Sequence, residues 1–170
     1  ISISSQCELA DVLRPIGLIC DALRYAHGKE IVHRDIKVSN ILLDGKGVPY
    51  LIDFGVAATG LQDGVASGGS VIAASPQQLR GETPAPPDDI LALGGLIFEL
   101  ITGSCPSGSN PTAEDIVGKT VPALADVVSE NIPAGLQELL NEMLDKSAAM
   151  RPDAESIGQR LATMGFAAGV

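Results

Sequence analysis

Apolar residues in the first part of the chain are spaced three and four positions apart. Between Ser5 and His27 they form one stripe, made of Leu9, Val12, Leu13, Ile16, Ile19, Cys20 and Leu23. Pro15 falls inside this stretch, and because proline removes a backbone hydrogen bond from a helix, we expect a kink or a break near it. The pattern therefore predicts a long amphipathic helix over 5–27 that is disturbed near its middle.

Short runs of β-prone residues follow, and then a long stretch without periodicity. The runs are Ile31–Val32, 41–43 and 50–52, and the last two flank the turn sequence Asp-Gly-Lys-Gly at 44–47. They predict a small hairpin. Residues 56–88 are rich in Gly, Ala, Ser and Pro, which predicts one long loop of the kind that is usually functional in a compact domain.

The second half of the chain has helical patterns. Residues 89–101 are almost wholly apolar, as in a helix that is buried on all sides. Residues 136–144 carry an amphipathic pattern, and Asp153 is a suitable N-cap for a last helix with Ile157, Leu161 and Met164 on its apolar face. The predicted fold class is thus mainly α with a small β-hairpin, within one domain.

Composition narrows the possible partners. With 3% aromatic residues and no Trp, the core should be aliphatic, and a net charge of -10 argues against nucleic acid and anionic membranes as partners. The longest apolar run, Ile90 to Phe98, is about half of what a membrane span needs, so no membrane segment is expected. Three cysteines are an odd number for a disulfide framework, and they favour a reducing, cytoplasmic location.

One motif carries the chemistry. Residues 33–40 read His-Arg-Asp-Ile-Lys-Val-Ser-Asn, and Asp-Phe-Gly follows at 53–55, with the predicted hairpin between them. This resembles the catalytic signature of eukaryotic-type serine/threonine protein kinases. The resemblance covers nearly all of 1–170 and implies a partial kinase domain with a protein-kinase-like C-terminal lobe. Its parts would be a catalytic loop at 33–40, a metal loop at 53–55, an activation segment at 53–77 and a helical remainder at 89–165.

The resemblance implies the role of each motif residue. Asp35 would accept or orient the proton of the substrate hydroxyl, and Lys37 would bind and stabilise the transferring phosphate of ATP. Asn40 and Asp53 would hold two Mg2+ ions, which prefer hard oxygen ligands. Because a lysine two residues after the aspartate is typical of serine/threonine kinases, the partner would be a protein substrate with a Ser or Thr acceptor.

The resemblance also assigns structural or regulatory roles. They fall on His33, Arg34, Phe54, Gly55, Ser70, Gln77, Asp89 and Arg151. His33 would be a packed core residue, Asp89 would hold the backbone of the catalytic loop, and Arg34 would pair with a phosphorylated activation segment. Ser67 and Ser70 are the candidate phosphorylation sites, and Ser67 is the better one. His27 carries no role beyond polarity at a helix end.

Gln77 departs from the family pattern. The stretch 69–77 looks like the segment that ends in Ala-Pro-Glu, so Gln77 replaces a glutamate that pairs with a buried arginine, here Arg151. Because a buried arginine without a carboxylate partner is costly, we expect lower stability, and we expect Gln77→Glu to raise the melting temperature.

Two alternative interpretations, a phosphate-binding loop and a small-molecule kinase, are weaker. Residues 113–120 fit a loose phosphate-loop pattern, but they contain one glycine and two carboxylates where phosphates would lie. Small-molecule kinases of the aminoglycoside type share a related pattern. Lys37, the Phe-Gly pair at 54–55 and the Ser-Pro-Gln run at 75–77 favour protein kinases instead.

The glycine-rich loop and the strand lysine with which this family binds ATP have no counterpart in the given sequence. No Gly-x-Gly-x-x-Gly precedes His33, and Lys29 is the only earlier lysine. Since the chain also starts without Met, we expect a truncated or excised product that lacks the N-lobe and binds ATP weakly or not at all. It would transfer phosphate when completed by an N-lobe or a larger parent chain, and its exposed interlobe surface would be prone to association. The alternative is a catalytically incompetent kinase-like module that acts by binding.

Overall fold

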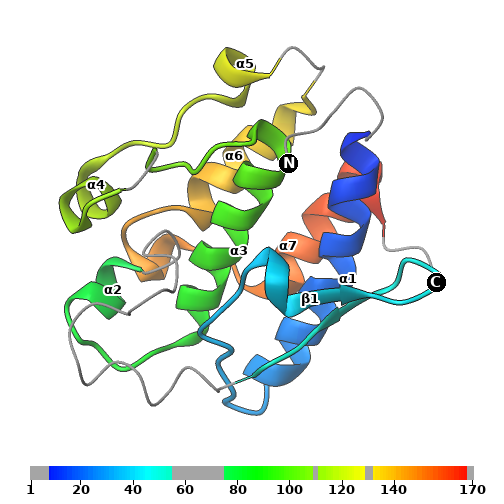
Figure 1. The fold of residues 1–170 in the computed structure, drawn as a ribbon, viewed down its shortest axis with the longest axis horizontal. Coiled ribbons are helices and arrows are strands. Elements are labelled where there is room, and N and C mark those ends of the chain that lie inside the picture. Colours follow the sequence, from blue (N-terminus) through cyan, green and yellow to red (C-terminus); the bar gives the residue numbers. More distant parts are fainter. Residues whose placement is uncertain (1–7, 55–74, 109–110, 129–131, 168–170) are drawn as a thin grey trace.

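The computed structural model describes residues 8–54, 75–108, 111–128 and 132–167 (Figure 1). Its helical elements are α1 Leu9–His27, η1 Val38–Asn40, α2 Pro76–Leu79, α3 Pro86–Thr102, α4 Ala113–Gly118, α5 Leu124–Val127, α6 Ala134–Met143, η4 Ala148–Met150, α7 Ala154–Leu161 and η5 Ala162–Phe166. Strands β1 (Ile41–Leu43) and β2 (Pro49–Leu51) form one antiparallel sheet. The predicted class, mainly α with a small hairpin, is confirmed.

Helix α1 carries the predicted stripe. Its inward residues Leu13, Ile16, Ile19 and Leu23 are buried against the rest of the core. The helix runs without interruption through Pro15, so the break that we considered does not occur. The carbonyl that Pro15 leaves without a partner belongs to Asp11, an exposed residue whose carbonyl water can solvate, so the lost bond is tolerated there.

The hairpin forms as predicted, one residue earlier on its second strand. Ile41 pairs with Leu51, and Leu42 pairs with Tyr50. The turn is closed by the Asp44 carboxylate, which accepts hydrogen bonds from the backbone N–H groups of Lys46 and Val48. The β-prone pair at 31–32 is not in a strand, because this stretch has no ladder partner among the described residues.

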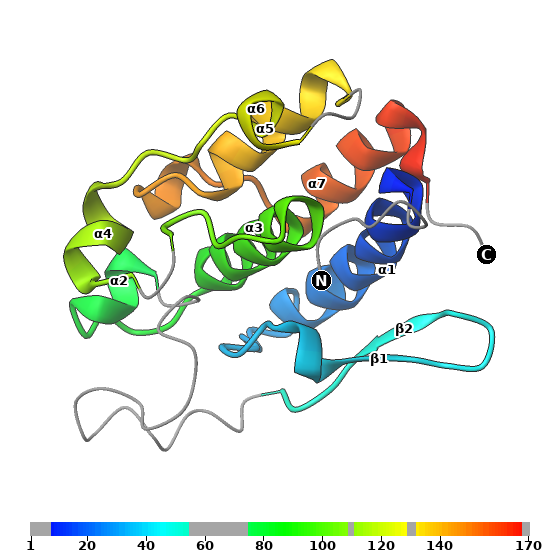
Figure 2. The same cartoon turned by 45° about the horizontal axis from the view of Figure 1, so that its top comes forward.

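Helix α3 lies at the centre of the fold. Figure 2 shows it between α6 on one side and α1 on the other, with the hairpin on the far side of α1. At Gly94 an added Cβ would lie 2.9 Å from Cβ of Met143, so the glycine lets α3 and α6 approach closely. The surrounding core is aliphatic, as expected, with Phe98 as its one fully buried aromatic residue among those described.

The predicted loop 56–88 is partly replaced by helix. Residues 55–74 lie outside the described part, but α2 follows them, and α3 begins at Pro86 and not at Asp89 as expected. Pro86 occupies the first helical position, where its missing N–H costs nothing. The predicted N-cap of α7 is confirmed, since the Asp153 side chain accepts from the N–H of Ser156 at 2.8 Å. Searching the described helices finds none that is both long and apolar enough to cross a membrane.

Candidate active site

The catalytic loop is anchored to the start of α3 by Asp89. This carboxylate is 1% exposed, and its two oxygens accept hydrogen bonds from the backbone N–H groups of His33 and Arg34, each at 2.8 Å. Nε2 of His27, at the end of α1, lies 2.8 Å from the Oδ2 atom of Asp89. The predicted role of Asp89 agrees with this geometry, whereas the view of His27 as simple helix-end polarity is wrong.

His33 connects the catalytic loop to the metal loop. Its ring is fully buried, and its Nδ1 accepts a hydrogen bond from the backbone N–H of Asp35 at 3.2 Å. Since Nδ1 is an acceptor, Nε2 carries the proton and donates to the carbonyl oxygen of Ile52 at 2.8 Å. The ring of Phe54 packs against it with centroids 4.6 Å apart. His33 is therefore a structural bridge, as the resemblance implies.

Three of the predicted chemical residues meet at one carboxylate. The Oδ2 atom of Asp35 lies 2.7 Å from Nζ of Lys37 and accepts a hydrogen bond from Nδ2 of Asn40 at 2.9 Å. Asn40 Nδ2 also donates to the backbone carbonyl of Asp35 at 2.8 Å, which fixes the curvature of the loop. No described residue donates to Oδ1 of Asp35. One oxygen is thus held in place, and the other remains available as an acceptor.

The environment keeps Asp35 ionised. Partial burial raises the pKa of its carboxyl, but the hydrogen bonds from Lys37 and Asn40 and the charge of Lys37 outweigh burial, and the net pKa is lower than the usual 3.8. Asp35 is therefore a carboxylate at neutral pH and can accept a hydrogen bond from a hydroxyl group.

The fourth predicted chemical residue, Asp53, follows a backbone hydrogen bond that joins its loop to Asn40. The N–H of Ile52 donates to the carbonyl of Asn40 at 2.9 Å, which ties the metal loop to the end of the catalytic loop. The Asp53 carboxylate is exposed and has no ion-pair or hydrogen-bond partner among the described residues. Its backbone φ is 63°, in the left-handed region.

The donor set at this edge suits Mg2+. Asn40 uses its amide nitrogen within the loop, its Oδ1 atom accepts no hydrogen bond from a described residue, and Asp53 adds a carboxylate. These are the hard oxygen ligands that Mg2+ prefers, with water and phosphate oxygens completing its shell. The described residues contain no cluster of three or more His, Cys, Asp or Glu side chains that could form an all-protein metal cage.

Three of the other predicted residues are not described by the structure. Gly55, Ser67 and Ser70 lie outside the described residues. Arg34 is described: its backbone φ is 74°, and its buried Nε has no hydrogen-bond acceptor in the described part of the chain.

The expected isolation of Arg151 is wrong. Its Nη2 donates to Oε1 of Gln77 at 2.8 Å, as predicted, but its Nη1 also lies 3.8 Å from the carboxylate of Asp88. The pairing therefore includes a negative charge that the sequence interpretation did not assign. The sequence interpretation gave a role to Asp89 alone, and nothing in the local pattern separates the role of Asp88 from that of its neighbour.

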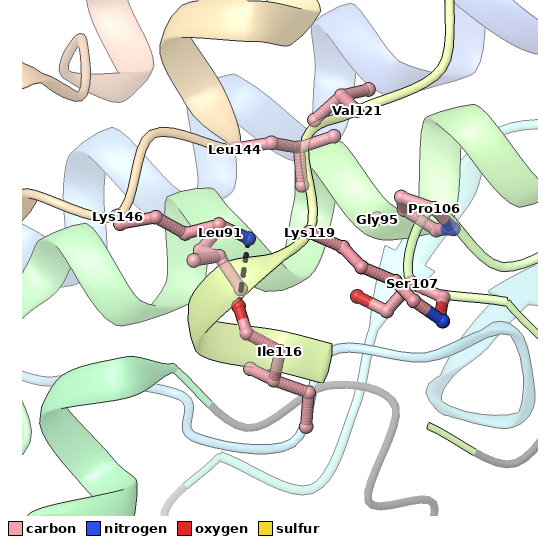
Figure 3. Close-up of a pocket in the computed structure, with 9 residues that line it drawn as sticks. All are labelled: Leu91, Gly95, Pro106, Ser107, Ile116, Lys119, Val121, Leu144 and Lys146. Atoms are coloured by element: carbon pink, nitrogen blue, oxygen red, sulfur yellow. Dashed lines mark hydrogen bonds between the residues drawn. The ribbon is translucent and has the colours of Figure 1, made fainter. Parts of the chain in front are cut away.

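A separate hollow lies between α3, α4 and the segment after α6 (Figure 3). Its walls are mostly aliphatic, and its two lysines are already bonded: Lys146 donates to the carbonyl of Ile116 at 2.7 Å, and Lys119 pairs with Asp115 at 2.9 Å. Residues 113–118 of the phosphate-loop-like stretch form α4, and Lys119, which directly follows the helix, is paired with Asp115 of its first turn. This supports the rejection of that stretch as a phosphate cradle.

Comparisons with known proteins show the family of the chain. The sequence model of the protein kinase domain matches residues 4–161. Serine/threonine-protein kinase STY46 of Arabidopsis thaliana is 30% identical over 145 residues, which cover 84% of this chain and 25% of the plant protein. Serine/threonine-protein kinase PrkC of Bacillus subtilis is 41% identical over 100 residues, or 56% of this chain and 15% of that protein.

A probable serine/threonine-protein kinase of Clostridium perfringens, CPE1738, is 31% identical over 150 residues, covering 83% of this chain and 22% of the relative. In each of these three comparisons the aligned part spans a quarter or less of the relative's length.

Proposed function

The chain belongs to the protein kinase family, and on that premise we propose that it is the catalytic-loop lobe of a serine/threonine protein kinase, which transfers the γ-phosphate of ATP to Ser or Thr of protein substrates. The observation that carries the proposal is the arrangement at Asp35. Lys37 and Asn40 hold its Oδ2 atom, while Oδ1 stays free to accept a proton. A binding module has no chemical need for a carboxylate held in this way.

In the proposed reaction the protein positions groups and balances charge. Asp35 Oδ1 orients the acceptor hydroxyl through a hydrogen bond and takes its proton as the hydroxyl oxygen bonds to the γ-phosphorus. The bond between that phosphorus and the β–γ bridging oxygen breaks in the same transfer, and ADP leaves. Lys37 keeps Asp35 in place and offers its ammonium to the phosphate. Asn40 and Asp53 are the proposed ligands of Mg2+, which supplies charge neutralisation on the phosphates when it is bound.

We also propose that the activation segment regulates the site. Arg34 has a buried Nε without an acceptor among the described residues, and its backbone is held beside Asp35 by Asp89. A phosphate on Ser67, or on Ser70, would supply acceptor oxygens for this guanidinium. Phe54 is proposed to set the position of the metal loop through its packing on His33. Gly55, which lies outside the described residues, stays a predicted part of that loop.

The proposed setting is a reducing one. Cys20 and Cys105 are free thiols, which supports the cytoplasm as the location. The net charge of -10 supports a protein substrate over nucleic acid. The second candidate function is a catalytically incompetent binding module.

A transfer assay separates the two functions. Radiolabelled Mg-ATP is supplied with a mixed protein substrate to this chain, and to the same chain extended by its upstream coding sequence. We expect phosphoserine and phosphothreonine from the extended protein and little from the 170 residues alone, because the residues that grip ATP are not among them. Activity in neither preparation would favour the binding module. Peptide mapping of the active preparation tests regulation: an active enzyme with no phosphate between Gly55 and Pro76 would exclude that part.

A further inference from the structure

Arg151 is the centre of a polar group that also contains the buried residues Ser75 and Asp88 and the half-buried Gln77. We call these four residues the Arg151 cluster. The side chain of Arg151 is 0% exposed and that of Asp88 is 3% exposed, so solvent does not screen their interaction. The cluster joins the end of the activation segment, the start of α3 and the segment before α7.

The hydrogen bonds of the guanidinium all go to neutral acceptors. Nε donates to the carbonyl of Asp145 at 2.8 Å, Nη1 to the carbonyl of Pro87 at 2.9 Å, and Nη2 to Gln77 Oε1 at 2.8 Å. None of these acceptors balances its charge. The carboxylate of Asp145 faces the N–H of Ser147, so among the described residues Asp88 makes the one ion pair of Arg151.

The side chain at position 77 accepts one hydrogen bond and donates another. Gln77 Oε1 accepts from Arg151, while Nε2 donates to the backbone carbonyl of Lys146 at 2.9 Å. A glutamate there would accept from Arg151 but would set a second oxygen against the Lys146 carbonyl. The amide therefore fits this position, provided that another residue supplies the negative charge.

Asp88 reaches the activation segment through Ser75. The hydroxyl of Ser75 donates to Oδ1 of Asp88 at 2.5 Å, and the same hydroxyl oxygen accepts from the N–H of Gln78 as the N-cap of α2. The other oxygen of Asp88 accepts from the N–H of Ala85 at 2.8 Å, at the start of α3. One carboxylate thus holds α2, α3 and Arg151 together.

We propose that Asp88 is the counterion of Arg151 in place of a carboxylate at position 77, and that through Ser75 it positions the Ser75–Gln77 end of the activation segment. In this arrangement the negative charge that faces Arg151 lies on α3 and not on the activation segment. Position 77 holds an amide that links Arg151 to the Lys146 carbonyl. The inference concerns this chain's own departure from the family pattern and does not depend on phosphoryl transfer.

The test is the thermal unfolding of four forms of the full-length protein: unmodified, Gln77→Glu, Asp88→Asn, and the double variant. Asp88→Asn should lower Tm by roughly 5 °C or more, because it removes the one ion pair that Arg151 makes with the described residues and leaves only the weaker effect of the Asp145 charge. Gln77→Glu alone should leave Tm unchanged or lower it. This replaces the rise expected from the sequence, because Asp88 already pairs with Arg151 and a glutamate could not donate to the Lys146 carbonyl. In the Asp88→Asn background the same change should raise Tm, since it returns the charge to position 77.

Asp153→Asn is the matched control. Asp153 is exposed, lies two residues from Arg151 in sequence, and caps α7 with an oxygen that asparagine retains. Gln77→Glu should change Tm by the same amount with or without it. If Asp88→Asn does not fold, folding of the double variant is the rescue that supports the proposal. A double variant that is no more stable than Asp88→Asn, or that also fails to fold, overturns it, as does a Gln77→Glu effect that is independent of residue 88.

Discussion

Two side chains of the candidate site, Arg34 and Asp53, stand on left-handed backbone, with φ of 74° and 63°. Such conformations cost of order 1–3 kcal/mol each in residues other than glycine and persist only where neighbours hold them. Here Asp89 holds the N–H of Arg34, and the bonds of Ile52 to His33 and Asn40 hold the chain just before Asp53. Two of the three described non-glycine residues with positive φ thus lie in the loops that carry the proposed chemistry, and the third is Glu30, at 60°.

The motif predicted which residues meet, but not all of the residues that hold them. Asp35, Lys37 and Asn40 are assembled by a local loop, so eight residues of sequence are enough to predict their meeting. His27 and Asp88 act through partners 62 and 63 residues away, and Asp89 is the partner of His27. Neither contact has a local pattern, and burial at both positions is set by how the helices pack.

Cys20 provides a prediction at this scale. It is 1% exposed in the core, and burial, with a smaller effect of Asp21, raises the pKa of its thiol to about 12. Because the thiolate is the reactive form, Cys20 should resist iodoacetamide at pH 8 in the folded protein and react after unfolding in urea. The half-buried Cys105 serves as the internal reference in the same sample and should react faster. Equal rates at the two thiols in the folded protein, measured by peptide mass spectrometry, would contradict this placement of Cys20.

At the scale of elements, α3 organises the site. Its first turn presents Asp88 to Arg151 and Asp89 to the catalytic loop, while most of its remaining length is buried, apart from the exposed Glu99. The apolar pattern predicted the buried helix, but its start was placed three residues late. Pro86 and Pro87 read as loop residues in sequence, whereas in the structure they form the first turn, where a helix tolerates proline.

The contact between α3 and α6 is tested by Gly94→Ala. An added methyl group would lie 2.9 Å from Met143 Cβ and 3.2 Å from Leu144 Cγ, so we expect a loss of roughly 1–3 kcal/mol in the free energy of unfolding. Gly95→Ala is the control, because the next position of the same helix has nothing within 4 Å of the added carbon. That change should be neutral or stabilising by up to about 1 kcal/mol. Urea denaturation measures both, and equal effects would be inconsistent with the close helix packing.

At the scale of the whole molecule, exposed apolar side chains gather near the candidate site. Val38, Leu42, Leu43, Tyr50 and Phe54 are all at least 36% exposed, and they come from the catalytic loop, the hairpin and the metal loop. These segments lie together on one side of α1 (Figure 2). They therefore form an exposed apolar surface beside the candidate site.

Features set by residues close together in sequence could be predicted, whereas contacts between distant segments could not. Helical stripes and one dense motif predicted the fold class and the chemical residues. The order in which helices pack, the close approach at Gly94 and the charge at Asp88 depend on contacts between distant segments, which a single sequence does not display.

The most direct test of the central claim, that Asp35 is the acceptor at a phosphoryl-transfer site, is the rate of substrate phosphorylation by the full-length protein carrying Asp35→Asn. The control is Asp44→Asn, an equal loss of charge in the exposed hairpin turn, where an asparagine oxygen can still accept the turn's hydrogen bonds. We predict a loss of at least about 100-fold in kcat for Asp35→Asn and little change for Asp44→Asn. Equal activity of the two variants would contradict the account.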